Sequence, residues 1–343
     1  MSLNNRIKSF FWKIDDSNRG VIYRESYKPF VNHPLNFEDL RVNEAVGYHN
    51  KKWDHNEIAI KVENGLVEPQ YAYVIEGLRT INGVSIRTRN NLPSPLPTLK
   101  AKLFSSCQKL DKAIVIDGSM GINYFHFLSD VLHKIYLFEE HISIDYPLLI
   151  GKQVFNKPFV QFLIKETDLR KYNWMPIEEP MLIKELYVAR PLPYKKEYWV
   201  KTKQLFVQNN KPIGKKKALF VNRTGTRRIS NLAVIKPILN EFQIEEFDPG
   251  KLNMREQAEV FNGATHIIGI HGAGLANVMF CNYEHTKVLE LCSNNRIGTQ
   301  YYWLCAALGI NWNMLLGGVA EADQSFELDP AEFRKTLEKL FAS

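Results

Sequence analysis

From about residue 113 onward, short apolar runs alternate with longer segments whose apolar residues have helical spacing. The runs at 113–117 (AIVID), 147–151 (PLLIG) and 265–270 (THIIGI) have the length and composition of buried strands. The segments at 123–141 and 157–167 have the period of helices. Short apolar strands that alternate with helices form a parallel sheet with helices on both faces. The sequence therefore predicts an α/β fold.

A second series of the same kind begins near residue 185. Its expected strands lie at 185–190, 217–222, 243–247, 265–270, 287–291 and 311–316, and its expected helices at 231–241, 253–263, 298–308 and 326–341. The chain of 343 residues is also longer than most single cores support. We therefore predict two Rossmann-like domains that face each other across a cleft.

The expected domain boundary falls between residues 184 and 185. The N-terminal domain, 1–184, should combine an irregular or β-containing extension over 1–100 with a Rossmann-like part over 113–184. The proline-punctuated stretch NNLPSPLPTLK (90–100) is the expected connector between them. The C-terminal domain, 185–343, should end with a helix that closes the fold.

The composition is that of a globular protein. Hydrophobic residues make up 45% of the chain and charged residues 24%, and no stretch offers the roughly 20 apolar residues of a membrane-spanning helix. The four cysteines form no CxxC pair and the nine histidines form no HExxH spacing, so neither a disulfide framework nor a metal site is expected. The start, MSLNNRIKSFFWKIDD, lacks the apolar core of a secretory signal, and we expect a cytoplasmic location. Its basic and aromatic residues leave open a peripheral contact with the inner face of a membrane.

The stretch HIIGIHGAGLANVMF (266–280) places a histidine and two glycines between a strand and a helix. Gly272 and Gly274 let the backbone approach a ligand closely, and the following helix directs free N–H groups and the positive end of its dipole toward an anion. His271 falls at the carboxyl end of the strand, where open parallel sheets bind ligands. The turn is a candidate seat for a diphosphate, with a packing role for the glycines as the alternative.

Glu290 lies eighteen positions after Gly272, at the end of the expected strand 287–291. A carboxylate in this place can accept two hydrogen bonds from a ribose diol. Strand, glycine turn, helix, strand and acid together are typical of a nucleotide-binding unit. A surface carboxylate at a strand end is the alternative interpretation of Glu290.

Three arginines follow the expected strand 217–222, in ALFVNRTGTRRISN (218–231). Arginine can bind phosphate oxygens through two parallel hydrogen bonds, and it can offset the charge of a departing diphosphate. We assign phosphate contact to Arg223 and Arg228. For Arg227 we favour a solvated basic turn.

In NYFHFLSDVLHKI (123–135), four polar residues share one face of the expected helix: His126, Asp130, His133 and Lys134. His126 and Asp130 are one turn apart, so the carboxylate can orient the imidazole and raise its basicity, as a general base requires. We therefore name His126 and Asp130 as catalytic candidates. A structural His–Asp pair is the alternative.

These motifs resemble a known family. NYFHFLSDVLHKI, FVNRTGTRRISN and IIGIHGAGLANVMF followed by VLEL look like the three ordered blocks of glycosyltransferase family 61, and the resemblance covers about 113–316. It implies a GT-B architecture and inverting transfer of a sugar from a nucleotide sugar, with UDP the expected nucleotide and no obligatory metal or other cofactor. Because no anchor or secretory signal is visible, the chain is similar to bacterial, cytosolic members that build capsule or surface polysaccharide. The implied acceptor is a glycan or a lipid-linked glycan.

The resemblance also carries roles to individual positions. Arg223 and Arg228 look like the diphosphate arginines, and His271, Gly272, Ala273 and Gly274 like the turn that holds the donor phosphates. Glu290 looks like the nucleoside contact, and His126 with Asp130 like the block that faces the acceptor.

Two other functions remain open from the residues alone. Gly272-Ala-Gly274 followed by Glu290 partly matches a dinucleotide fingerprint, which would indicate an NAD(P)-dependent oxidoreductase, although Asn277 stands where a third small residue belongs. The net charge of +7 also admits a non-catalytic basic binding protein. The basic residues form no single stripe with interleaved aromatics, so we expect no nucleic-acid partner.

Overall fold

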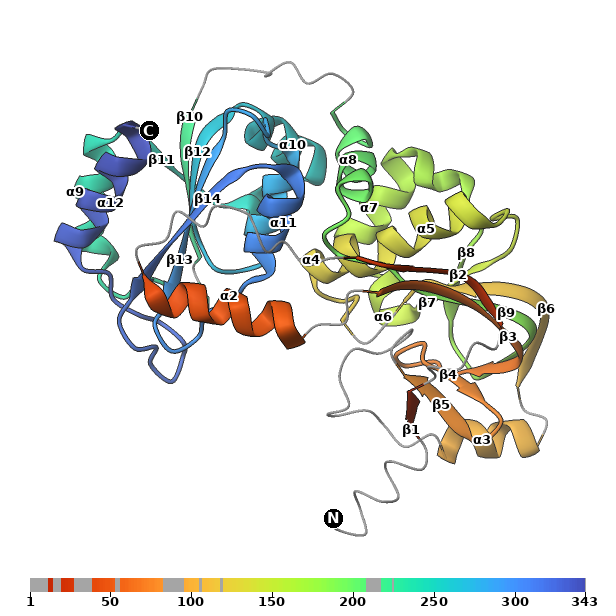
Figure 1. Ribbon diagram of the computed structural model, residues 1–343. Coiled ribbons are helices and arrows are strands. Elements are labelled where there is room, and N and C mark those ends of the chain that lie inside the picture. The colour runs from red at the N-terminus through yellow and green to blue at the C-terminus, as the bar shows by residue number, and fades with distance from the viewer. Residues whose placement is uncertain are drawn as a thin grey trace, which may run out of the picture. The chain divides into compact units, whose positions relative to one another are not determined.

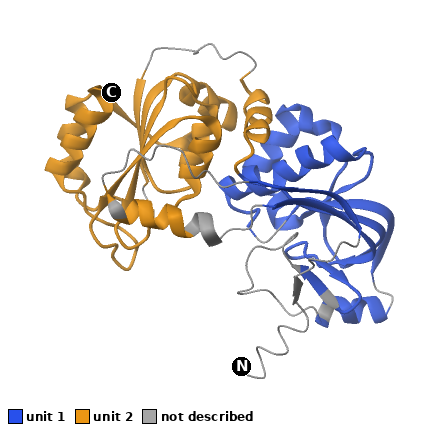
Figure 2. Ribbon diagram, in the orientation of Figure 1, with its two compact units in different colours: residues 1–27, 55–193 blue, residues 28–54, 194–343 orange. Residues whose placement is uncertain are grey.

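The computed structural model describes residues 12–14, 20–27, 39–52, 56–82, 96–104, 107–117, 120–207, 217–223 and 225–342. The chain divides into two compact units, as Figure 2 shows. The first comprises residues 1–27 and 55–193, and the second comprises residues 28–54 and 194–343. Each unit has its own sheet.

The first unit is built on a nine-stranded mixed sheet. Its strands are β1 (Trp12–Ile14), β2 (Val21–Ser26), β3 (Asn56–Val67), β4 (Val74–Glu76), β5 (Arg79–Asn82), β6 (Gln108–Val115), β7 (Leu148–Gly151), β8 (Trp174–Ile177) and β9 (Met181–Arg190). The strands β9-β6-β7-β8 are parallel, whereas β3 is antiparallel to β2, β4 and β9. Only part of this sheet therefore has the parallel order of a Rossmann-like domain.

The helices of the first unit are α3 (Leu96–Leu103), α4 (Tyr124–His126), α5 (His133–His141), α6 (Lys152–Phe155), α7 (Pro158–Glu166) and the 3-10 helix η2 (Asp168–Lys171). A π-helical segment, η1 (Phe127–Leu132), joins α4 to α5. The continuous helix expected at 123–141 is thus interrupted by a π segment. Such segments occur often at functional sites.

The second unit contains a five-stranded parallel sheet. Its strands, β10 (Lys217–Val221), β11 (Ile244–Phe247), β12 (Ala264–Ile270), β13 (Lys287–Ser293) and β14 (Asn311–Gly317), have the order β11-β10-β12-β13-β14. From β10 the chain continues to β11 on one side of the sheet and then returns to form β12 on the other side of β10. The strand order therefore reverses between β10 and β12. In open α/β sheets, ligands bind at the carboxyl ends of the strands beside such a reversal.

Helices cover both faces of this second sheet, as Figure 1 shows. The helices of the unit are α2 (Leu40–Lys52), α8 (Lys196–Gln204), α9 (Leu232–Glu241), α10 (Met254–Asn262), α11 (Gln300–Leu308) and α12 (Pro330–Ala342), with the 3-10 helices η3 (Pro249–Lys251) and η4 (Ala273–Phe280). α9 and α12 lie on one side of the sheet, and α10 and α11 on the other. Side chains of α9 and α12, such as Ile235 and Leu337, pack on Ile268 and Leu289 of the strands.

The α/β class is confirmed, and the expected strands and helices of the second series are present. The structure corrects one assignment. The run 185–190 belongs to β9, which pairs with β3 and β6 in the first sheet, so the expected boundary after residue 184 falls inside a strand. The compact units instead divide at 193/194, and residues 28–54 belong to the second unit. Most of the connector expected at 90–100 lies outside the described residues, and its last part begins α3.

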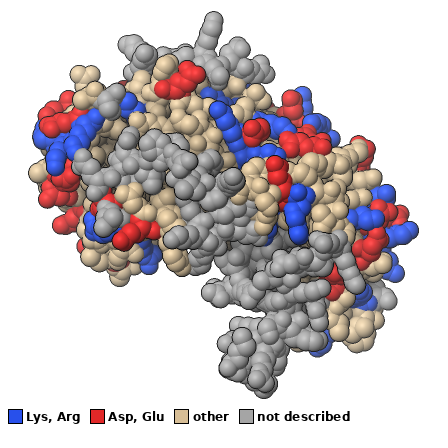
Figure 3. Space-filling view, viewed as in Figure 1, with Lys and Arg blue, Asp and Glu red and all other residues tan. Residues whose placement is uncertain are grey.

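The charges on the surface are mixed. On the face shown in Figure 3, Lys and Arg side chains are interspersed with Asp and Glu. Within the described ranges, no helix has both the length and the apolar character needed to cross a bilayer.

Candidate functional site

The glycine turn lies at the carboxyl end of β12, beside the reversal of strand order. His271 and Gly272 follow the strand directly, and η4 begins at Ala273. The helix expected here is a 3-10 helix whose first residues have no side-chain cap. Tyr301 of α11 donates a hydrogen bond to the carbonyl of Gly272 at 2.5 Å, which fixes the turn against the helix.

The absence of a side chain at Gly272 makes room for Arg223. A Cβ at position 272 would lie 1.5 Å from Nη1 of Arg223. The guanidinium donates to the carbonyl of Thr226 (3.1 Å) and to that of His271 (3.5 Å). Burial, and then the positive charge of Arg227, lower the pKa of Arg223. The half-buried guanidinium of Arg223 therefore holds the turn through the carbonyl of His271. Gly274 is also closely packed, since a Cβ there would lie 3.0 Å from Pro249.

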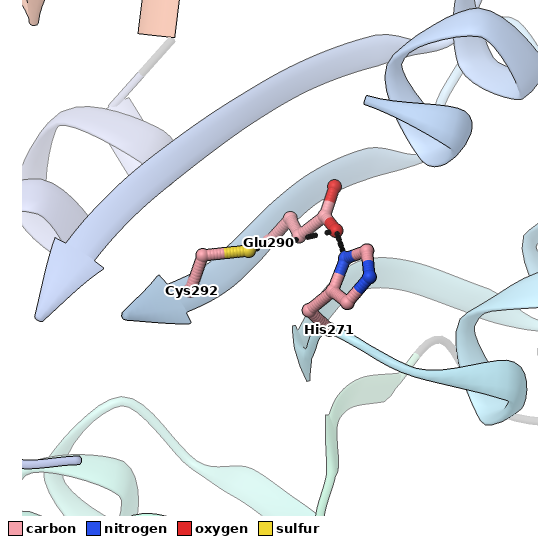
Figure 4. Close-up of side chains that lie close together, drawn as sticks. All are labelled: His271, Glu290 and Cys292. Carbon is pink, nitrogen blue, oxygen red and sulfur yellow. Dashed lines mark hydrogen bonds and ion pairs between the residues drawn. The ribbon is translucent and has the colours of Figure 1, made fainter. Parts of the chain in front are cut away.

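His271 forms a close pair with Glu290, as Figure 4 shows. Nδ1 of His271 lies 2.5 Å from Oε1 of Glu290. The other carboxylate oxygen, Oε2, accepts a hydrogen bond from the indole of Trp312 at 3.0 Å. The Glu290 side chain is fully buried, and that of His271 is 12% exposed. The buried carboxylate therefore holds the imidazole by its Nδ1 and leaves Nε2 on the other side of the ring.

Two residues of the β13–α11 segment complete the surroundings of the ring. Nε2 of Gln300 lies 3.0 Å from Nε2 of His271. A Cβ at Gly298 would lie 2.2 Å from Cε1 of His271, so the ring occupies space that only glycine leaves free. The His271 ring also meets that of Tyr301 edge to face at 5.4 Å. Its position is fixed from several sides.

The structure places Glu290 differently from the sequence expectation. We expected the strand to end near 291, with Glu290 available to a ribose. β13 continues to Ser293, so Glu290 lies within the strand, and both of its oxygens are engaged by His271 and Trp312. Ser293 holds the strand-end position instead. Glu290 therefore contacts His271 and is not exposed to solvent.

Among the described residues, one group has the composition of a metal site: His271, Glu290 and Cys292, whose ligand atoms lie within 4.8 Å of one another. Bound to one tetrahedral zinc ion, a nitrogen and an oxygen ligand would be about 3.4 Å apart. The separation of 2.5 Å between His271 and Glu290 is that of a hydrogen bond instead. Burial, and then the charge of Glu290, raise the pKa of Cys292, so its thiol stays protonated. The group is arranged as a hydrogen-bonded cluster.

A cavity of about 360 Å³ opens beside this cluster. Its lining residues come from the carboxyl ends of β12 and β13 and the loops after β10, β13 and β14: Arg227, Ile270, His271, Cys292, Ser293, Arg296, Ile297, Gly298, Gln324 and Phe326. Two arginines and a histidine thus face one space whose remaining wall is largely apolar. Such a cavity is suited to an anionic group attached to a flat or apolar one.

The arginines after β10 have contacts that the sequence did not predict. Arg228 forms an exposed ion pair with Asp323 at 2.9 Å and does not line the cavity. Arg227, for which we expected a solvated turn, does line it. Its Nε atom is buried without a hydrogen-bond partner among the described residues, and its φ of 65° lies in the left-handed region. A left-handed backbone at a non-glycine residue and a buried N–H donor without a partner are features found at ligand sites.

In the first unit, His126 and Asp130 are paired as expected. Nδ1 of His126 lies 3.0 Å from Oδ2 of Asp130, and Ser129 donates to the other carboxylate oxygen at 2.9 Å. Both side chains remain partly exposed, at 26% and 18%. Asn123 caps the start of the helix through the backbone N–H groups of Phe125 and His126. The pair is therefore accessible and oriented.

The other two polar residues of this helix are buried. His133 is fully buried and Lys134 is 4% exposed. Lys134 donates to the backbone carbonyl of Asp117 at 2.6 Å, and Asp117 in turn accepts from the N–H of Gly151 at 2.8 Å. These contacts join the ends of β6 and β7. The polar face expected from the sequence thus divides into an accessible pair and a buried structural group.

Sequence reasoning missed several residues of the candidate site: Ser293, Arg296, Gly298 and Gln324, which line the cavity, and Gln300 and Trp312, which contact His271 and Glu290. The stretch CSNNRIG (292–298) carried one usable signal, because a polar, glycine-containing loop follows a buried strand at the edge where ligands bind. Gln324 and Trp312 carried none. Trp312 reaches the site because β14 pairs with β13. Gln324 reaches it because the chain nearby forms a β-bridge between Phe326 and Ile229.

Comparison with protein families gives a match to the family described as Glycosyltransferase 61 over residues 124–289. The matched region includes His126, Asp130, Arg227 and His271 and ends within β13. No curated protein matches the chain.

Proposed function

We propose that the chain transfers a sugar from a nucleoside diphosphate sugar to a hydroxyl group of a glycan, with UDP the expected nucleotide. The match to Glycosyltransferase 61 indicates that the chain is a glycosyltransferase. The proposal assigns donor binding to the second unit. It also assigns the chain to the GT-B class of two Rossmann-like domains. The observation that carries it is the cavity that Arg227, Arg296 and His271 share at the reversal of strand order.

The charges of the cavity support a diphosphate donor. Arg227 and Arg296 are permanent cations, and Arg223 adds a third behind the turn. When the bond between sugar and phosphate breaks, negative charge develops on the departing diphosphate. Positive groups already fixed beside that charge stabilise the transition state more than the ground state. We therefore propose that these side chains take the place of a divalent metal in offsetting the leaving-group charge.

Individual roles follow from the contacts. Arg227 replaces Arg228 as the proposed phosphate ligand, because Arg227 lines the cavity whereas Arg228 is paired with Asp323. Arg223 holds the turn that presents His271 and Ala273. The apolar side chains of Ile270 and Phe326 offer a surface for the nucleoside. Glu290 orients His271 and is not proposed as a nucleoside contact.

For the transfer step we propose direct displacement at the anomeric carbon, which inverts its configuration. The acceptor hydroxyl loses its proton as it attacks, and the nucleoside diphosphate leaves. His126 is the proposed general base, because its imidazole is partly exposed and its Nδ1 is held by Asp130. With Nδ1 bonded to the carboxylate, Nε2 remains to accept the proton.

The resemblance of the motif blocks to bacterial members of the family extends the proposal to the biological role. We propose synthesis of capsule or surface polysaccharide, a glycan or lipid-linked glycan as acceptor, and a cytoplasmic site of action. A peripheral membrane contact through residues 1–16 was considered from the sequence, and most of that segment lies outside the described residues.

Calorimetric titration with UDP and a panel of UDP-sugars tests the proposal. We expect binding by the wild-type protein and release of UDP when an acceptor glycan is added, with EDTA having no effect. Arg227→Gln should weaken UDP binding about 10- to 100-fold, since a hydrogen bond to a charged group contributes about 1.5–3 kcal/mol. The neighbouring Arg228→Gln is the matched control and should bind UDP as the wild type does. If no nucleotide or nucleotide sugar binds, or if Arg228→Gln is the variant that fails, the assignment of the cavity is wrong.

A further inference from the structure

Helix α3 of the first unit has apolar side chains on its outer face as well as on its inner one. On the inner face, Leu99 is 7% exposed and packs with Ile75 of β4. Figure 1 shows the helix beside β4 and β5. On the outer face, Leu96, Leu103 and Phe104 are 50%, 80% and 81% exposed. A surface helix of a globular protein normally has polar side chains there.

The exposed side chains form one continuous surface. The backbone N–H of Phe104 donates to the carbonyl of Lys100 at 3.0 Å, so the helical hydrogen bonding continues to Phe104. Lys100 and Phe104 follow Leu96 by four and eight positions, which places these three residues on one face of the helix. Leu103 extends that face at the last turn. A single exposed lysine thus lies among three exposed apolar side chains.

The charge of this part of the chain is positive. Residues 77–110 contain six basic residues and no Asp or Glu. Within the ranges that the structure describes, Lys100, Lys102 and Lys109 form no ion pair with a carboxylate. Burial raises the pKa of the nearby Cys107 thiol, which Glu179 also raises, whereas Lys102 and Lys109 lower it. Cations therefore outnumber carboxylates beside α3.

Exposed leucine and phenylalanine beside unpaired lysines match the surface of an anionic bilayer. Apolar side chains of an interfacial helix enter the boundary between headgroups and acyl chains, and lysines attract anionic headgroups. An acidic protein could also attract the lysines, but it would need a pocket shaped for Leu103 and Phe104. A bilayer accepts protruding side chains without a preformed pocket, so the large exposure of these two residues favours lipid.

We propose that the outer face of α3, formed by Leu96, Lys100, Leu103 and Phe104 with Lys102 beside it, binds the surface of an anionic lipid bilayer. The contact lies at the interface and does not span the membrane. It does not depend on the donor site, so it is tested separately from nucleotide binding. Such a contact brings the first unit to the surface where a lipid-linked acceptor is found.

Flotation of the full-length chain with vesicles tests the proposal. The two vesicle types are phosphatidylcholine alone and an equal mixture of phosphatidylcholine and phosphatidylglycerol. We expect binding to the anionic vesicles to be about tenfold stronger or more, and to weaken at high salt. Leu103→Gln combined with Phe104→Gln should weaken it by about tenfold or more, because both apolar side chains lose their burial in lipid. Lys100→Gln should weaken it about fivefold.

Two matched controls change the same residue types elsewhere. Val234→Gln alters an apolar side chain that is 55% exposed on α9, and Lys251→Gln alters an exposed lysine of η3. Both variants should bind the anionic vesicles as the wild type does. Thermal unfolding checks that every variant is folded, which we expect because each altered side chain is on the surface.

The remaining outcomes overturn the proposal. If the wild type binds neither vesicle type, or binds both equally, α3 is not a site for anionic lipid. If the α3 variants bind as well as the wild type, the membrane contact lies elsewhere in the chain. If the chain binds poly-glutamate through Leu103, Phe104 and Lys100 but no vesicle, the face belongs to an acidic protein partner instead.

Discussion

Arg223 fills the space that a side chain at Gly272 would need: a Cβ there would lie 1.5 Å from the guanidinium nitrogen Nη1. Gly272 itself has extended backbone angles that any residue can adopt, so the requirement for glycine is one of space. We expect Gly272→Ala to displace the Arg223 guanidinium and to destabilise the protein by about 1 kcal/mol, the low end for overpacking, because the displaced atoms are the far end of a flexible side chain. Urea unfolding measures the loss, and UDP titration should show weaker binding.

The neighbouring glycine of the arginine loop supplies the control. A Cβ at Gly225 would have no atom within 4 Å, so Gly225→Ala should leave stability nearly unchanged. In a background of Arg223→Ala, the Gly272→Ala change should cost little, because the atoms it collides with are gone. Equal destabilisation by Gly272→Ala with and without Arg223 would show that the contact is not the cause.

Gly298 should be required for activity rather than for folding. Its backbone lies against the His271 ring, and a methyl group there would meet Cε1 at 2.2 Å. We expect Gly298→Ala to push the ring off Glu290 and to lower sugar transfer at least tenfold, with a small change in the midpoint of thermal unfolding. Gly318→Ala is the control, since its Cβ would make only an ordinary contact at 3.7 Å. Full transfer by Gly298→Ala would mean that the position of the ring is unimportant.

The His126–Asp130 pair should affect transfer without affecting the donor. Both residues belong to the first unit, whereas the cavity belongs to the second. We expect His126→Ala to lower the rate of transfer about 10²- to 10⁴-fold, the usual contribution of a general base, with UDP affinity unchanged. Asp130→Asn should give a smaller loss. His141→Ala, in the same helical stretch, should transfer normally, and wild-type transfer by His126→Ala would assign the base elsewhere.

The fold of the second unit could be predicted from the sequence because each strand is a short apolar run between helices of clear period. The first sheet was harder to predict. β9 follows the parallel strands in the chain but pairs with β3, whose residues come from the region for which only an irregular or β-containing extension was expected. Pairing between strands that far apart in the chain leaves no local pattern. The boundary was placed inside β9 for that reason.

The sequence pattern identified the glycines and histidines of the candidate site, but not the contacts that these residues make. The turn, His271 and the His126–Asp130 pair were identified by residue type and spacing. The choice between Arg227 and Arg228 was not, because it depends on Asp323, which comes from a distant loop and pairs with Arg228. Likewise, the role of Glu290 depends on Trp312 and on the extent of β13.

Stability should fall in mild acid because of His266. Its ring stacks on that of Phe341 from α12, with centroids 4.0 Å apart and planes 5° from parallel. Burial, and then the charge of Lys287, lower the pKa of His266 below its usual value of 6.5. The unfolded chain therefore binds a proton at a higher pH than the folded one does. As the pH falls through 6.5 toward the folded-state pKa, the unfolded state gains stability and the free energy of unfolding decreases.

His266→Phe removes the titrating group and keeps an aromatic ring on Phe341. We expect its free energy of unfolding, measured with urea, to fall less between pH 7.5 and pH 5.5 than that of the wild type. The difference should stay under about 1 kcal/mol, because His266 is only half-buried and solvent screens its charge. His285→Phe is the control, since His285 is exposed and should leave the pH dependence unchanged. Parallel pH profiles for the wild type and His266→Phe would contradict the prediction and would place the acid sensitivity in other groups.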